Sequence, residues 1–278
     1  MDLSRTIYRS PVFKAAAGTA MDFYRSALFG RGLDDTRRSE MTSALVLAPH
    51  PDDETLGCGA TILRKRAAGT PVRVVVVTDG GGSHRSAILD GMELKEIRRR
   101  EAVAACAHLG VGRDDVKLLG YADGTLAGEV HRLTHDILRL AADFRPGEIL
   151  APSWMDGHPD HRGLNQAVRR ATLLMETPIP VLEYPVWFWD ARSWVDFDAS
   201  AFVKAGQLLS RPLALLGRCR PRVVPTGPFL AGKRAAVAAY RSQLCNITGE
   251  PGWPVLDPAF LRCFLGQQEI FFPSEKTS

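Results

Sequence analysis

The stretch ALVLAPHPDDE, residues 44–54, is the part of the chain that determines its fold class. Residues 44–48 form an uninterrupted apolar run, which is typical of a strand buried on both faces of a sheet. His50 and the three adjacent carboxylates of Asp52, Asp53 and Glu54 follow at once, and a helical segment comes next. This order places the polar motif at the carboxyl end of a parallel strand, where open α/β sheets bind their ligands.

On either side of this stretch, apolar β-branched runs alternate with segments of helical periodicity. We expect strands at residues 44–48, 72–78, 116–119, 148–151 and 181–187. We expect helices at residues 21–29, 55–67, 92–109, 129–144, 161–174, 201–216 and 229–244. The alternation predicts an α/β protein with a Rossmann-like, three-layer fold, in which helices cover both faces of a mostly parallel sheet.

The domain organisation follows from the absence of an internal repeat or a linker in the sequence. We expect residues 41–278 to form a single domain whose C-terminal part is an elaboration of the regular sheet. Residues 1–40 carry no clear strand and form an N-terminal extension. The short amphipathic helix at residues 21–29 either packs on the main domain or serves as a lid or a dimer contact.

Composition and charge exclude several classes of protein. The chain has 278 residues, of which 45% are hydrophobic and 24% charged, as in globular domains rather than disordered chains. A net charge of +4, with no basic run longer than three arginines, argues against a nucleic-acid partner. Five scattered cysteines without a CxxC motif indicate a reducing compartment. Because no segment is typical of a signal peptide or a transmembrane helix, we expect a cytoplasmic protein.

The first motif allows two interpretations. The carboxylates of Asp52, Asp53 and Glu54 repel one another beside a strand end, and a bound cation would remove that cost. Helix capping and the helix dipole also favour acidic residues at this position. Capping accounts for one or two of the carboxylates but not for His50, so metal binding and capping both remain open for this motif alone.

A second motif, DGHPDH at residues 156–161, also lies between a predicted strand and a predicted helix. Pro159 suits the first turn of that helix. His158 and His161, with their acidic neighbours, are ligands that suit zinc or another divalent ion such as iron. Since the carboxyl ends of parallel strands meet at one edge of a sheet, the two motifs are expected to form one site. Two histidines and one carboxylate with an open position are a catalytic zinc arrangement.

Together, HPDDE at residues 50–54 and HPDH at residues 158–161 resemble the zinc-dependent LmbE-like deacetylases, also called the PIG-L family. The resemblance covers roughly residues 43–245. Weaker matches are TDG at 78–80, Arg98–Glu101, YADG at 121–124 and Lys233–Gln243. Members of this family remove an N-acetyl group from a glucosamine unit of a larger molecule.

The resemblance implies a role for each matching residue. His50, Asp53 and His161 would bind Zn²⁺, with Fe²⁺ as an alternative. Asp52 would be the general base. His158 would either stabilise the developing oxyanion or protonate the leaving amine. These roles suit the chemistry, because an amide is a poor electrophile and water is a poor nucleophile.

The substrate-binding set is also taken from the resemblance and from sequence position. Arg98 and Asp123 match positions that contact the sugar in relatives. Asp156 stands where some relatives carry a tyrosine, and Trp154 lies just before the second motif, so we include both in this set. A turn at residues 123–124 is the alternative for Asp123, and Arg98 has two possible partners, Glu101 or the cleft.

The glycine-rich loop at residues 80–82 lacks both phosphate-binding fingerprints, which argues against a nucleotide site. We expect a loop beside the active site, with His84 facing solvent. Tryptophans 154, 187, 189 and 194 form either a sugar-stacking platform or a hydrophobic wall.

The predicted function is therefore a metal-dependent hydrolase that removes an N-acetyl group from an N-acetylglucosamine-type sugar or a lipid or other glycoconjugate. Two alternatives remain: an amidase that cleaves a larger amide on a sugar or thiol conjugate, and a catalytically inactive sugar-binding module.

Overall fold

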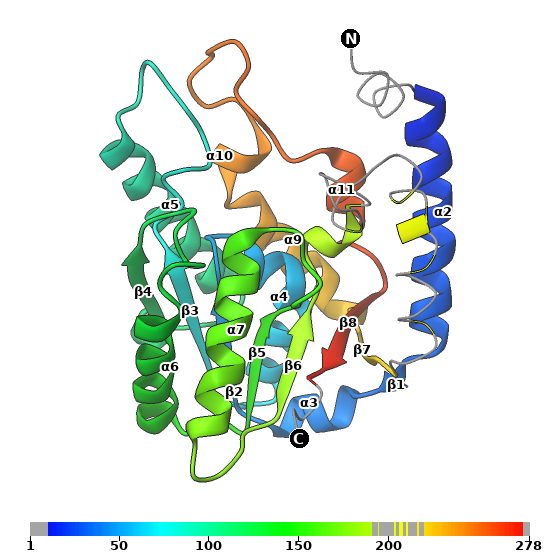
Figure 1. The fold of residues 1–278 in the computed structure, drawn as a ribbon, viewed down its shortest axis with the longest axis vertical. Helices are drawn as coiled ribbons and strands as arrows, with labels where there is room; N and C mark the ends of the chain where they lie inside the picture. Colours follow the sequence, from blue (N-terminus) through cyan, green and yellow to red (C-terminus); the bar gives the residue numbers. More distant parts are fainter. Residues whose placement is uncertain are drawn as a thin grey trace.

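The computed structural model describes residues 11–190 and 220–274, together with six isolated residues between these ranges. Its centre is an eight-stranded sheet with helices on both faces (Figure 1), which confirms the predicted fold class. The strands are β1 (Leu33–Asp34), β2 (Ala44–Ala48), β3 (Val72–Thr78), β4 (Val116–Tyr121), β5 (Glu148–Pro152), β6 (Val181–Tyr184), β7 (Arg222–Pro225) and β8 (Gln268–Pro273). Among the described residues, no helix is both long and apolar enough to cross a membrane.

The strand order is β1-β7-β8-β6-β5-β2-β3-β4. Strand β2 pairs in parallel with β3 on one side and with β5 on the other. Strands β4 and β6 extend this sheet in parallel, and β1 pairs in parallel with β7. Strand β8 is antiparallel to both β6 and β7 and joins the two halves. The sheet is therefore mostly parallel, as expected.

The helices are α2 (Pro11–Gly30), α3 (Thr36–Met41), α4 (Asp53–Ala67), α5 (Gly91–His108), α6 (Val130–Phe144), α7 (Pro159–Leu174), α9 (Leu230–Ala238), α10 (Arg241–Leu244) and α11 (Pro258–Arg262). Short 3₁₀ turns lie at Arg113–Asp115, Trp187–Trp189 and Gly227–Phe229.

Alternating side chains of the central strands build two cores, one on each face of the sheet. In β2, Val46 belongs to the core that α4, α5 and α9 cover, whereas Leu45 and Leu47 belong to the core under α6 and α7. Figure 1 shows α6 and α7 together on one side of the sheet. Because both faces are covered, the central strands consist almost entirely of apolar residues.

Three strands, β1, β7 and β8, were not predicted. Strand β1 lies within residues 1–40, where we expected none, and pairs with β7 through only two residues. Strand β8 begins with Gln268 and Glu269, and the buried Glu269 carboxylate pairs with Lys233. A charged residue at a buried position removes the apolar pattern on which strand prediction relies.

Other differences concern boundaries. The predicted strand at 181–187 ends at Tyr184, before Pro185, and the chain continues into a 3₁₀ turn. The helix predicted at 229–244 is interrupted at Tyr240, whose ψ of 60° is not helical. The helix predicted at 201–216 lies outside the described residues, apart from isolated positions.

The described part of helix α2 packs on the main sheet. Leu28 has no exposed surface, and the Tyr24 ring contacts Trp194 edge-on with ring centroids 5.0 Å apart. Tyr24 also lies near Phe188, at 6.2 Å between ring centroids. This end of the extension therefore packs against the turn that follows β6, as in the first of the two interpretations given for residues 21–29.

Helix α4 is broken near its middle, and a buried ion pair satisfies the backbone groups that the break leaves unpaired. Lys233 Nζ donates to the carbonyl oxygen of Leu56 at 2.7 Å. The Glu269 carboxylate accepts from two backbone amides of α4 at 2.8 Å each, and from Lys233 Nζ at 2.7 Å. Both charged side chains are buried. The pair therefore fixes the shape of the helix that carries the first motif.

Candidate active site

The two motifs meet at the point where the strand order of the sheet reverses. The chain leaves β2 through α4 to reach β3 on one side, whereas β5 lies on the opposite side of β2. Such a switch point forms a crevice at the carboxyl ends of the strands. The first motif follows β2 and the second follows β5, so both motifs lie at this edge of the sheet.

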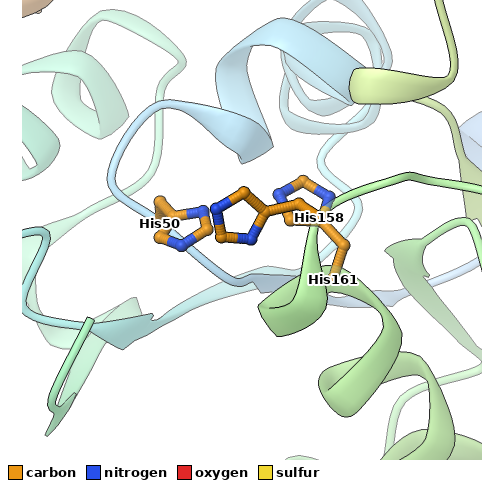
Figure 2. Close-up of side chains that lie close together, drawn as sticks. All are labelled: His50, His158 and His161. Atoms are coloured by element: carbon orange, nitrogen blue, oxygen red, sulfur yellow. The ribbon is translucent and has the colours of Figure 1, made fainter. Parts of the chain in front are cut away.

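Three histidine rings lie together there (Figure 2). The ring centroids of His50 and His158 are 4.7 Å apart, and those of His50 and His161 are 5.3 Å apart. Each of these residues offers a ring nitrogen within 4.8 Å of the others. Asp53 Oδ2 lies 3.2 Å from both His50 Nδ1 and His161 Nε2. The structure thus brings together His50, Asp53 and His161, the three predicted ligands.

The donor set fits a divalent cation. His161 is fully buried, and its Nε2 atom makes no well-aligned hydrogen bond among the described residues, although Asp53 Oδ2 lies 3.2 Å away. His50 Nε2 lies 3.1 Å from Asp160 Oδ2 and 3.2 Å from Asp123 Oδ1, which leaves Nδ1 facing Asp53. A buried nitrogen without a well-formed hydrogen bond is rare in proteins, and a cation coordinated by these imidazole and carboxylate groups would satisfy it.

The charges in the site are strongly coupled. Burial opposes protonation of His161, but Asp53 and Asp156 raise its pKa to about 9. Burial likewise opposes ionisation of Asp53, yet His161 and His50 hold the pKa of this carboxyl well below its usual range. In the absence of a cation the positive charge of the histidines is therefore the partner of the Asp53 carboxylate.

Asp52 is held in an unusual backbone conformation. Its φ is 125°, a value that non-glycine residues rarely adopt and that is found preferentially at functional sites. The Asp52 amide donates to Glu54 Oε2 at 3.2 Å, and Tyr240 donates to the other oxygen of Glu54 at 2.5 Å. Arg98 donates to the carbonyl of Pro51 and lies 3.4 Å from Asp52 Oδ2. Burial raises the pKa of Asp52 to about 7, although Arg98 opposes this shift.

His158 caps helix α7. Its Nδ1 accepts a hydrogen bond from the Asp160 amide at 3.2 Å. Burial and the nearby His50 and His161 lower the pKa of His158 to about 4, so the ring is neutral at pH 7. Because Nδ1 accepts, the proton of the neutral ring is on Nε2, which is free to donate.

Comparison with known proteins agrees with this geometry. The model of the PIG-L family, described as GlcNAc-PI de-N-acetylase, matches residues 45–172, a range that includes both motifs. The 1D-myo-inositol 2-acetamido-2-deoxy-alpha-D-glucopyranoside deacetylase of Mycolicibacterium vanbaalenii is 31% identical over 238 residues, which cover 76% of this chain and 83% of that protein. The chain belongs to the PIG-L family.

Two further relatives place this PIG-L chain among proteins named as sugar deacetylases. The diacetylchitobiose deacetylase of Thermococcus kodakarensis is 31% identical over 127 residues, and the chain spans about half of that protein, 46% of its length. The solved structure of the N,N'-diacetylchitobiose deacetylase from Pyrococcus horikoshii aligns with a TM-score of 0.61 and 21% identity, covering 84% of this chain and 83% of that one. That likeness confirms the α/β fold.

The predicted substrate-binding residues of this PIG-L chain fall into different environments. Trp154 is 56% exposed just before the second motif. Asp123 Oδ1 lies 3.2 Å from His50 Nε2, and Asp123 Oδ2 accepts a hydrogen bond from the Gly82 amide at 3.0 Å. Arg98 is buried beside Asp52 and lies 3.4 Å from its Oδ2 atom, whereas Glu101, its other expected partner, accepts from Ser242.

Asp156 differs most from the prediction. Its side chain has no exposed surface, and both of its oxygens accept hydrogen bonds from the protein. In this conformation it is inaccessible to a substrate. The burial of Asp156 follows from the close packing of the turn after β6, which a sequence position between two motifs does not reveal.

The prediction that His84 faces solvent is wrong. Its ring is buried and stacks on Trp253 with centroids 4.2 Å apart, and Nε2 lies 2.8 Å from the Pro254 carbonyl oxygen. Nearby, Ser86 and the Ala87 amide donate to Glu250. The glycine-rich loop is therefore hydrogen-bonded to the segment that follows α10, at Glu250 and Pro254. A lone histidine in a glycine-rich loop gives no sign of a partner so distant in the chain.

We expect His84 to make this protein less stable in mild acid. Burial lowers the pKa of His84 from 6.5, although the Pro254 carbonyl opposes this. The unfolded chain therefore binds the proton more readily, and this contribution to the free energy of unfolding is present above pH 6.5 and lost as the pH falls through and below it. Urea denaturation at pH 7 and about pH 5 should show a smaller loss in His84→Asn than in the parent. The exposed His131→Asn should behave like the parent, and equal losses in all three proteins would refute this role.

Proposed function

We propose that this chain is a metal-dependent hydrolase that removes the N-acetyl group from an N-acetylglucosamine unit of a sugar or glycoconjugate. The convergence of His50 Nδ1 and His161 Nε2 on Asp53 Oδ2, 3.2 Å from each, carries this proposal. The names of the relatives support the reaction class, because they are deacetylases of acetylated amino sugars. Retention of Asp52 and His158 beside this cluster favours an enzyme over an inactive binding module.

We assign a divalent cation to His50, Asp53 and His161. Two imidazoles and one carboxylate suit Zn²⁺, and Fe²⁺ accepts the same ligands. A bound cation would polarise the amide carbonyl and lower the pKa of a water molecule. Each histidine already uses its other ring nitrogen for a carboxylate, which orients the lone pair toward the site.

The remaining roles belong to Asp52 and His158. Asp52 takes the proton from the attacking water as the new carbon–oxygen bond forms, and a pKa near neutrality suits a general base. His158 Nε2–H donates to the oxygen that becomes negative in the transition state. When the carbon–nitrogen bond breaks, the proton held by Asp52 passes to the amine, so that acetate and a free amino sugar leave.

For the substrate, we propose that the exposed Trp154 indole packs against the sugar or its aglycone. Asp123, which is partly accessible beside His50, would accept a hydrogen bond from a sugar hydroxyl. Arg98 is buried and would act by holding Asp52 in place.

The metal content of the protein tests this function first. We expect about one zinc or iron per chain by elemental analysis of untagged protein purified without chelator, and acetate release from N-acetylglucosamine conjugates. His161→Ala should lose both the metal and the activity, because it removes a ligand with no exposed surface. His131→Ala, an exposed histidine on α6, should retain both. No bound metal after reconstitution with zinc would exclude the proposed hydrolase.

A further inference from the structure

The buried carboxylate of Asp156 has three hydrogen-bond partners, which come from two different parts of the chain. Asp156 Oδ2 lies 2.8 Å from His161 Nδ1. The Val186 amide donates to the carboxylate at 3.1 Å and the Phe188 amide donates to Oδ1 at 2.7 Å. The carboxylate thus connects helix α7 to the turn after β6.

From these contacts we infer that Asp156 is a positioning residue for the proposed metal site: it selects the tautomer of His161 and locks that ring to the turn at residues 186–188. The inference rests on the proposed metal-dependent function. It replaces the substrate-binding role expected from the sequence with a role exerted through His161.

The tautomer follows from counting donors and acceptors. Two of the three partners of Asp156 are backbone amides, which can only donate, so the carboxylate acts as the acceptor in this cluster. The third partner, His161 Nδ1, then carries a proton and donates as well. In a neutral ring this leaves the lone pair on Nε2, the buried atom that faces Asp53 without a well-aligned hydrogen bond. An acceptor-only side chain at position 156 therefore prepares His161 to bind a cation through Nε2.

The same carboxylate also orders one wall of the site. The turn that it holds carries Trp187, whose ring lies 6.3 Å from the His158 ring at an interplanar angle of 25°. Trp187 also stacks on Phe260 with centroids 5.0 Å apart. Asp156 is thus connected to the ligand His161 directly and to the surroundings of His158 through the turn.

Asp156→Asn is the decisive variant, because it keeps the shape of the side chain and replaces one acceptor oxygen by a donor. Whichever way the amide is oriented, its NH₂ group faces either His161 Nδ1 or a backbone N–H. We expect the affinity for Zn²⁺, measured by competition with a chromophoric chelator, to fall roughly 10–100-fold. In the metal-free protein at a pH above about 9, where the His161 ring is neutral, nitrogen NMR should show the proton on Nδ1 in the parent and a larger Nε2–H population in the variant.

Controls separate this role from a general loss of structure. Asp136→Asn, on α6 and away from the site, should bind Zn²⁺ like the parent. Urea denaturation of both variants identifies the conditions in which each is folded. If the role of Asp156 were purely structural, Asp156→Asn would have a lower free energy of unfolding, but the folded variant would keep the Zn²⁺ affinity and the His161 tautomer of the parent. Unchanged affinity and tautomer in folded Asp156→Asn would overturn the inference while the parent still binds Zn²⁺. If the parent binds no Zn²⁺, the proposed function itself fails.

Discussion

Replacement of Asp52 by alanine is expected to leave about one metal ion per chain and to lower kcat roughly 10²–10⁴-fold. The atoms that converge on the proposed cation belong to His50, Asp53 and His161, so the variant retains every ligand. What it removes is the proton acceptor for the attacking water. KM should change much less than kcat, because Asp52 acts on water rather than on the sugar.

The measurement combines elemental analysis with a kinetic assay of released acetate. Since Asp52 has a positive φ, alanine adds backbone strain, and Asp52→Asn provides a second variant that tolerates this conformation better. Asp53→Ala should differ from both by losing the metal as well as the activity. Full turnover by metal-loaded Asp52→Ala and Asp52→Asn would remove Asp52 from the mechanism.

The second large effect concerns stability. Glu269→Ala should lower the free energy of unfolding by roughly 3–5 kcal/mol, because it leaves the buried ammonium of Lys233 without its counter-charge. It also leaves two amides at the break in α4 without an acceptor. Asp53, a proposed metal ligand, is the first residue of α4. As urea is added, the variant should therefore lose its metal at a lower urea concentration than the one at which the whole protein unfolds.

Urea denaturation monitored by circular dichroism gives this free energy. The double variant Lys233→Met with Glu269→Leu should be destabilised less than Glu269→Ala alone, because no unpaired charge remains buried. Glu176→Ala, at an exposed position, should lie within about 0.5 kcal/mol of the parent. A Glu269→Ala variant as stable as Glu176→Ala would show that the ion pair contributes little.

The central strands could be predicted from the sequence because burial on both faces leaves a continuous apolar run. Strands β2, β3 and β5 have this pattern, and each was expected within a residue of its observed bounds. Strands β7 and β8 could not be predicted in this way. Strand β7 has only four residues. In β8, Glu269 places a charge at a buried position, where Lys233 and two backbone amides of α4, all distant in sequence, bind it.

For the site, too, the features set by strand order could be predicted, and those set by side-chain packing could not. The meeting of the two motifs could be predicted, because each motif lies between a strand and a helix and adjacent parallel strands bring such segments together. The choice of His50, Asp53 and His161 within them came from the resemblance to the PIG-L family. Asp160 as the partner of His50, and Tyr240 as the partner of Glu54, could not be predicted, because both contacts depend on side-chain packing between distant segments. His84 was missed for the same reason, since its stacking partner Trp253 belongs to another loop.

The position of β8 has a consequence for biosynthesis. Strands β1 and β7 join the rest of the sheet only through β8, which is synthesised after every other described strand. At roughly 5–20 residues per second, the ribosome needs on the order of ten seconds between β6 and β8. Until residues 268–273 leave the exit tunnel, the nascent chain exposes the unpaired edge of β6 and lacks the Glu269 carboxylate for α4. In that interval the exposed edge is the site at which a chaperone, or another nascent chain, can pair with it.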